Sequence, residues 1–83
     1  MRYAIVWDEV AIDTAARFLK DDHDGLRQVM DAVDLLADNP RPDGTFEYGS
    51  PDLRRMHVGR HRVMYEITDN VLTIVVIHLG RLS

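Results

Sequence analysis

The chain of 83 residues lacks cysteine and long hydrophobic runs. Without cysteine, disulfide bonds and thiolate chemistry are excluded, which fits a reducing compartment. The longest apolar runs, Tyr3 to Trp7 and Ile74 to Ile77, are far too short to cross a bilayer. Asp8 and Glu9 interrupt the first run, which does not fit a signal peptide. We therefore expect one domain spanning residues 1–83 of a cytoplasmic protein that has no membrane partner.

Positive charge is scarce overall, but it is concentrated in the last part of the chain. Ten Lys and Arg residues stand against 14 Asp and Glu, a formal net charge of −4 that disfavours a nucleic-acid partner. Residues 1–52 hold five basic and twelve acidic residues, net −7, whereas residues 53–83 hold five arginines and two acids, net +3. Because salt screens most interactions beyond about 10 Å, an anionic ligand would respond to the local excess.

The first half of the chain predicts one strand and two helices. Residues 2–7 are rich in aromatic and β-branched side chains, as in a strand. Asp8 is a predicted N-cap for a helix over about residues 9–20. Apolar residues at three- and four-residue spacing predict a second helix from residue 25 or 26 to 37, which Asn39-Pro40 ends. Residues 41–52 predict a loop, with a short strand at residues 45–48 as an option.

The second half predicts a three-stranded antiparallel meander over residues 53–80. Gly59-Arg60 and Asp69-Asn70 are predicted to form two-residue turns. The last strand, from Val71 to Leu79, is apolar on both faces, which is typical of a strand buried on both sides. The order β-α-α-β-β-β predicts an α+β fold, in which the two helices pack on one face of a small, mainly antiparallel sheet.

The predicted turns decide which basic residues share the face that the helices leave open. A turn at Gly59-Arg60 places His57 opposite Arg62, with Arg55 one step away on the same face. Arg81 joins them if the second turn has two residues, whereas a three-residue loop would reverse its face. A face that mixes arginines with apolar side chains is typical of a ligand groove or a docking surface.

The other polar and aromatic candidates carry less weight. His61 and His78 share the parity of the core face at the end of the sheet, so we expect them to be packed or rim residues rather than to bind a ligand. The histidines are thus split between faces, and no metal site or other cofactor is predicted. Arg54 also falls on the core face, and we expect its stem to reach water at a strand end. Phe46 and Tyr48 fit either stacking on a nucleobase or, more simply, anchoring of the loop.

The ordered set of segments resembles the RelE/ParE superfamily of bacterial toxins from toxin–antitoxin pairs. YAIVWDEVAIDTAARFL is similar to the first strand and helix of that family, and VMDAVDLLADNPRPDG to its second helix with the Asn-Pro exit. LRRMHVGRHRVMYEI followed by VLTIVVIHLGR is similar to its strand, glycine turn, arginine-bearing strand and final apolar strand. No segment is specific by itself, but their order over nearly the whole chain is.

The resemblance implies a RelE-like fold and a toxin that inhibits bacterial growth. Its activity would be that of a ribosome-dependent mRNA endonuclease, which promotes attack of the ribose 2′-OH on the adjacent phosphate without a metal. The alternatives are a ParE-like poison of DNA gyrase and a partner-binding module with weak or no catalysis. The implied partners are the ribosome with its mRNA and a cognate antitoxin in a toxin–antitoxin hetero-oligomer.

Carried over by position, the resemblance implies catalytic roles for four residues, Arg62, His57, Arg55 and Arg81, and RNA contacts for two more, Arg54 and Arg60. Two features depart from the family: His57 stands where a lysine or arginine is common, and the tyrosine or histidine that often follows the last strand is lacking.

The residue types on the open face fit the chemistry of RNA cleavage, which needs a base, an acid and charge stabilisation. His57 can exchange a proton near neutral pH. Arg62 suits bidentate contact with the scissile phosphate, and Arg55 and Arg81 suit flanking phosphates or developing charge. The competing interpretation is a solvated sheet face on which Glu66 neutralises one of the arginines.

Overall fold

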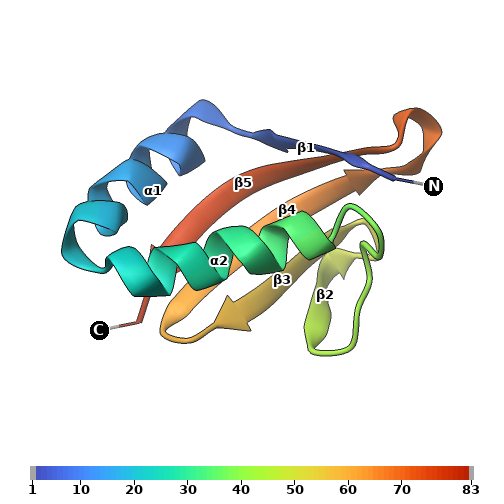
Figure 1. The fold of residues 1–83 in the computed structure, drawn as a ribbon. Helices are drawn as coiled ribbons and strands as arrows, with labels where there is room; N and C mark the ends of the chain where they lie inside the picture. Colours follow the sequence, from blue (N-terminus) through green and yellow to red (C-terminus); the bar gives the residue numbers. More distant parts are fainter. Residues whose placement is uncertain (1, 83) are drawn as a thin grey trace.

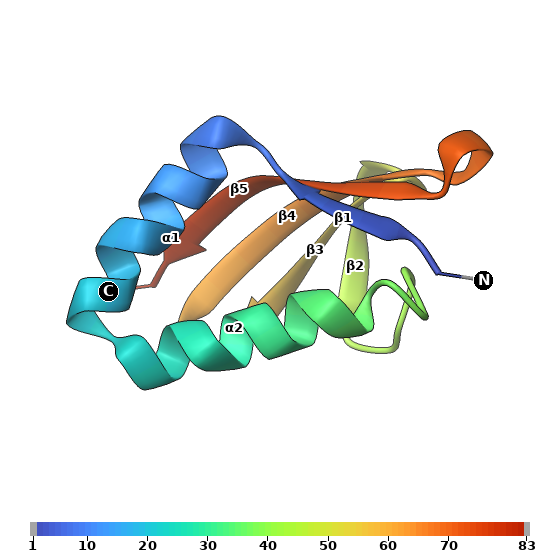
Figure 2. The same ribbon diagram turned by 45° about the horizontal axis from the view of Figure 1, so that its top comes forward.

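In the computed structural model, which describes residues 2–82, two helices cover one face of a five-stranded sheet (Figures 1 and 2). The elements in chain order are β1 (Ala4–Trp7), α1 (Glu9–Asp21), α2 (His23–Leu35), β2 (Thr45–Ser50), β3 (Leu53–Val58), β4 (His61–Thr68) and β5 (Thr73–Arg81). The predicted α+β fold is confirmed, and the optional strand is present as β2. None of the described helices combines the length and apolar character of a membrane span.

The strands are arranged in the order β1-β5-β4-β3-β2, with β1 parallel to β5 and all other neighbours antiparallel. The two helices carry the chain from the β1 edge to the β2 edge, and the meander then returns through β3 and β4 (Figure 1). The last strand therefore lies between the first strand and β4, and the first and last strands pair in parallel.

Aspartates fix the beginnings of both helices. The Asp8 carboxylate accepts a hydrogen bond from the Val10 amide at 3.2 Å, as its predicted role as an N-cap requires. Asp22 accepts one from the Gly25 amide at 3.1 Å. Because Asp22 caps α2, this helix begins at His23, two or three residues before the predicted start at residue 25 or 26.

The core lies between the helices and the sheet. Each helix contributes one apolar stripe, and β3, β4 and β5 contribute alternate residues; the buried set is Ala11, Ala15, Leu26, Val29, Val33, Leu36, Met56, Val63, Tyr65, Ile67, Ile74, Val76 and Leu79. Burial of one large apolar side chain contributes about 1.5–3 kcal/mol. Tyr65 is fully buried, and its hydroxyl donates a 2.7 Å hydrogen bond to the Pro40 carbonyl, which anchors the exit of α2 to the sheet.

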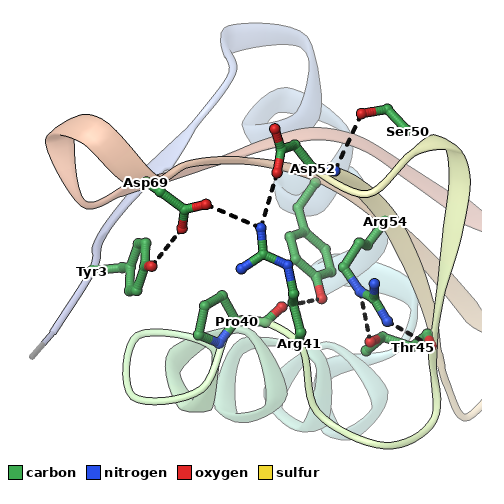
Figure 3. A network of polar contacts seen from close by, with 9 residues as sticks. Tyr3, Pro40, Arg41, Thr45, Ser50, Asp52, Arg54 and Asp69 are labelled. Atoms are coloured by element: carbon green, nitrogen blue, oxygen red, sulfur yellow. Dashed lines mark hydrogen bonds and ion pairs between the residues drawn. The ribbon is translucent and has the colours of Figure 1, made fainter.

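A polar network holds the loop after α2 against the β4–β5 turn (Figure 3). Arg41 Nη2 donates to Asp52 Oδ1 at 2.9 Å and to Asp69 Oδ2 at 3.2 Å. The Tyr3 hydroxyl donates to the other Asp69 oxygen at 2.6 Å, and this hydrogen bond lowers the pKa of the Asp69 carboxyl. Four separate parts of the sequence are thereby held together at one end of the sheet.

The predicted register of the first hairpin is confirmed, since His57 lies opposite Arg62 and Arg55 opposite Met64. Gly59 in its turn has a φ of +59°, which glycine tolerates best. The second turn is longer than the predicted two residues. It is a short 3₁₀ helix over Asp69–Val71, followed by Leu72 with a left-handed φ of +47°.

A β-bulge interrupts the pairing of β4 with β5. Tyr65 lies opposite Val76, but its neighbour Met64 lies opposite His78, so one extra residue of β5 fits between the two pairs. Because successive side chains alternate faces, the extra residue exchanges the faces of all β5 residues beyond it.

Candidate functional site

The bulge changes which β5 side chains reach the open face. Before it, Val75 lies opposite Glu66 on that face, as predicted. Beyond it, His78 lies opposite Met64 and therefore joins the open face, whereas Leu79 turns into the core. The prediction that His78 belongs to the core face is wrong, and so is the prediction that Arg81 shares a face with Arg62.

Arg81 lies instead on the face that the helices cover, opposite His61. Its guanidinium carbon is 4.3 Å from the centroid of the Phe18 ring, and its Nη1 is 3.6 Å from Asp21 Oδ2. Both contacts are with α1, so Arg81 joins the end of β5 to this helix. The structure thus separates Arg81 from the three other predicted catalytic residues.

Arg54 and Arg60, the two further predicted RNA contacts, also lie away from the open face. Arg54 Nε and Nη2 donate to the hydroxyl and carbonyl oxygens of Thr45, each at 3.1 Å, and the side chain is partly buried (Figure 3). The expectation that it reaches water at a strand end is wrong because β2 lies beside it. Arg60 Nε lies 3.4 Å from Asp22 Oδ2 at the start of α2.

Arg55 and Arg62 are brought together as predicted. They line a hollow of about 200 Å³ on the open face, whose wall is completed by Tyr48, Val63, Met64 and His78. The guanidinium carbon of Arg55 lies 5.3 Å from the centroid of the Tyr48 ring, in a cation–π contact. The hollow thus combines two guanidinium groups, an imidazole and a phenol, which are groups suited to binding an anion.

The two arginines of the hollow have no carboxylate partner within residues 2–82, whereas Arg2, Arg41, Arg60 and Arg81 each pair with an aspartate. Glu66 is exposed on the same face but forms no ion pair with a described arginine. The part of the competing interpretation in which Glu66 neutralises one of the arginines is thus not seen among the described ion pairs, while a solvated sheet face stays an alternative. Two uncompensated positive charges remain for a ligand.

His57 is exposed at the end of β3, directly opposite Arg62. The pairing of β2 with β3 reaches only as far as Met56, so β2 does not cover this end of β3. His57 is therefore the cross-strand neighbour of Arg62, but it does not line the hollow; it lines a separate pocket that Leu35 of α2 also borders. Within residues 2–82, no group of three or more His, Asp or Glu side chains is placed to hold a metal ion.

Phe46 and Tyr48 extend the open face along β2. Phe46 lies opposite Arg55 in the sheet, and the two aromatic side chains are 58% and 49% exposed. Side chains this exposed contribute little to anchoring a loop. They instead place aromatic rings beside the arginines, on the side of the hollow away from β5.

His78 is the residue of the site that reasoning from the sequence missed. The face on which His78 lies depends on the β-bulge in β5. No residue type in this part of the sequence predicts that bulge. A bulge can be recognised in a sequence only where it interrupts an alternation of polar and apolar residues. Residues 74–77 are all apolar, so they show no such alternation.

Comparison with known proteins agrees with this fold. Residues 7–82 match the family described as "ParE toxin of type II toxin-antitoxin system, parDE". The match covers nearly the whole chain, so the chain belongs to this family and is a type II toxin of the RelE/ParE group. A search of curated proteins finds no match.

Solved toxin structures share the fold at low sequence identity. The isolated E. coli RelE toxin superimposes with a TM-score of 0.82 at 19% identity, over 98% of this chain and 85% of that one. The intact E. coli RelBE toxin–antitoxin complex gives 0.80 at 19% identity, over 98% of both chains. A YoeB/ParE toxin from Agrobacterium tumefaciens gives 0.75 at 15% identity, over 96% and 98%.

Proposed function

We propose that this toxin is an endonuclease that cleaves mRNA on the ribosome by attack of the 2′-OH on the neighbouring phosphate. The observation that carries the proposal is the hollow, in which Arg55 and Arg62 lie without a carboxylate partner from the described part of the chain, residues 2–82. A guanidinium presents paired donors that match two phosphate oxygens, and it remains charged throughout the reaction. The same groups would stabilise the extra negative charge of the phosphorane.

Three residues of the open face have a role in this proposal. Arg62 lies on the central strand of the meander and contacts the scissile phosphate. Arg55, held against the Tyr48 ring, binds the neighbouring phosphate or the developing charge. His57, opposite Arg62, exchanges a proton with the reacting oxygens. Arg81 has no catalytic part, because it is engaged with α1 on the other face.

Poisoning of DNA gyrase is the second candidate, and the family match favours it because the matched family is described as the ParE toxin of parDE. In that case the open face would be a protein-binding surface. The arginines would then contribute to affinity rather than to chemistry, and no RNA would be cut.

We also propose that a cognate antitoxin binds the open face and neutralises the toxin. Two observations support a protein partner there: apolar side chains of the sheet outside the hollow are exposed or half-exposed, among them Val6, Leu53 and Ile77, and the two arginines of the hollow lack carboxylate partners among residues 2–82. An antitoxin segment with apolar and acidic side chains would complement both features. The E. coli RelE fold is known in complex with an antitoxin, which agrees with such a pairing.

Induced expression with primer extension on translated mRNA tests the proposed activity. The parent is expected to arrest growth and to cut mRNA within translated codons, and Arg62→Ala and His57→Ala are expected to lose both effects. Arg27→Ala, an exposed arginine on α2, is the matched control and should behave as the parent does. Growth arrest with double-strand DNA breaks and intact mRNA would instead establish the gyrase candidate.

A further inference from the structure

Two imidazoles flank Arg62, one on each neighbouring strand. On β3, His57 lies directly opposite Arg62. On β5, the residue opposite Arg62 is Gly80, and His78 precedes it by two positions on the same face. Because neighbouring strands are about 4.8 Å apart, the backbones of β3 and β5 are separated by roughly 10 Å at this level, with Arg62 between them.

The absence of a side chain at Gly80 lets the His78 ring lie close to Arg62. A Cβ atom built on Gly80 would lie 3.2 Å from His78 Nε2 and 3.9 Å from its Cδ2. The imidazole therefore leans over the glycine, into the space beside Arg62 that a larger residue would occupy. His78 also lines the hollow that contains Arg55 and Arg62.

We propose that His78 is a catalytic residue that acts together with His57, so that one imidazole serves as the base and the other as the acid around the phosphate bound by Arg62. This inference rests on the proposed mRNA cleavage and assigns it a second proton-transfer group. Cleavage needs two such groups on opposite sides of the phosphorus, because the attacking and leaving oxygens lie in line. A single histidine on one side of Arg62 reaches only one of these oxygens.

The step balances without a further co-reactant. The neutral imidazole takes the proton of the 2′-OH while the 2′-oxygen forms its bond to phosphorus. The protonated imidazole gives its proton to the 5′-oxygen while the bond between phosphorus and that oxygen breaks. The products are a 2′,3′-cyclic phosphate and a 5′-hydroxyl, and imidazole supplies both protonation states near neutral pH. Arg62 and Arg55 remain charged and hold the phosphate oxygens.

The test measures single-turnover cleavage of ribosome-bound mRNA by the parent, His57→Ala and His78→Ala. It uses two substrates, one with the natural linkage and one with sulfur in place of the 5′-oxygen at the cut, since a thiolate leaves without protonation. With the natural linkage, each variant is expected to be about 10²-fold to 10⁴-fold slower than the parent. With the sulfur linkage, only the variant that lacks the acid should recover most of the parental rate.

Two further variants separate chemistry from structure. Gly80→Ala keeps both histidines but crowds the His78 ring, whose Nε2 would lie 3.2 Å from the new Cβ, so it should shift the ring, slow the natural substrate and leave binding of mRNA unchanged. His23→Ala, at the exposed start of α2, should have no effect. Circular dichroism confirms that each variant is folded.

Each outcome decides the inference. If the parent cuts mRNA and His78→Ala cuts equally fast, the inference is overturned and the proposed function stands. If the sulfur linkage rescues neither histidine variant, or both, the division into acid and base is overturned. If the parent cuts no mRNA at all, the proposed function fails and the inference fails with it. If His57→Ala and His78→Ala both cut the natural linkage slowly and the sulfur linkage rescues only one of them, the two histidines act as an acid–base pair.

Discussion

The buried His61 should make the stability of the fold depend on pH. This side chain is 1% exposed, and its Nε2 has no hydrogen-bond partner within residues 2–82. Burial lowers the pKa of His61, the nearby positive charges of Arg60 and Arg81 lower it further, and the Asp22 carboxylate, 3.9 Å from Nε2, opposes them. The imidazole therefore takes up a proton less readily in the fold than in the unfolded chain.

The direction and the upper limit of this pH dependence follow from the difference between the pKa of His61 in the folded chain and in the unfolded chain. Because the folded pKa lies below the ordinary value, the unfolded chain binds the proton first as the pH falls. The free energy of unfolding should therefore decrease from about pH 6.5 down to the folded pKa, by at most about 1.4 kcal/mol per pH unit for one proton. Asp22 does not contribute in this range, since its pKa is lowered by the hydrogen bond from the Gly25 amide.

Urea unfolding between about pH 7.5 and about pH 5.5 measures this dependence. The variant His61→Leu has a similar volume and no titratable group, so its free energy of unfolding should change less with pH than that of the parent. It should also be at least as stable as the parent at the acidic end, because the unpaired ring nitrogen is gone. His23→Ala, at an exposed position, is the control and should keep the parental slope. Equal slopes for the parent and His61→Leu would refute the reasoning.

Three other variants test separate parts of the structure. Tyr65→Phe leaves the Pro40 carbonyl without its donor and should lower the free energy of unfolding in urea by about 1–2 kcal/mol, whereas the exposed Tyr48→Phe should not. Arg41→Ala removes contacts with two aspartates and should lower the melting temperature, with a smaller difference at high salt. Phe46→Ala should raise the KM for mRNA about 5-fold to 150-fold, as loss of 1–3 kcal/mol of base stacking predicts, while Phe46→Tyr should not.

The open face of the first hairpin was predictable because two local signals agree. Polar and apolar residues alternate along β3 and β4, and a glycine turn sets their register, so His57, Arg55 and Arg62 were placed correctly. Arg54 was misplaced because its partner Thr45 comes from a strand that the sequence indicated only weakly.

The contribution of β5 to the site was not predictable. The bulge places His78 on the open face and Arg81 against α1. It falls in a run of apolar residues that would fit a strand with or without a bulge. Its cause is tertiary: Leu79 packs in the core, while Arg81 contacts Phe18 and Asp21. Neither contact can be read from local periodicity.

The position of β5 between β1 and β4 has a consequence for how the protein is made. While the first 72 residues are being synthesised, β1 has no strand to pair with, and β4 lacks one of its two neighbours. The nascent chain can form helices and a hairpin, but it cannot close the sheet or bring His78 to Arg62. An incomplete chain therefore lacks both the fold and the site, so translation that stops before Thr73 yields no active toxin.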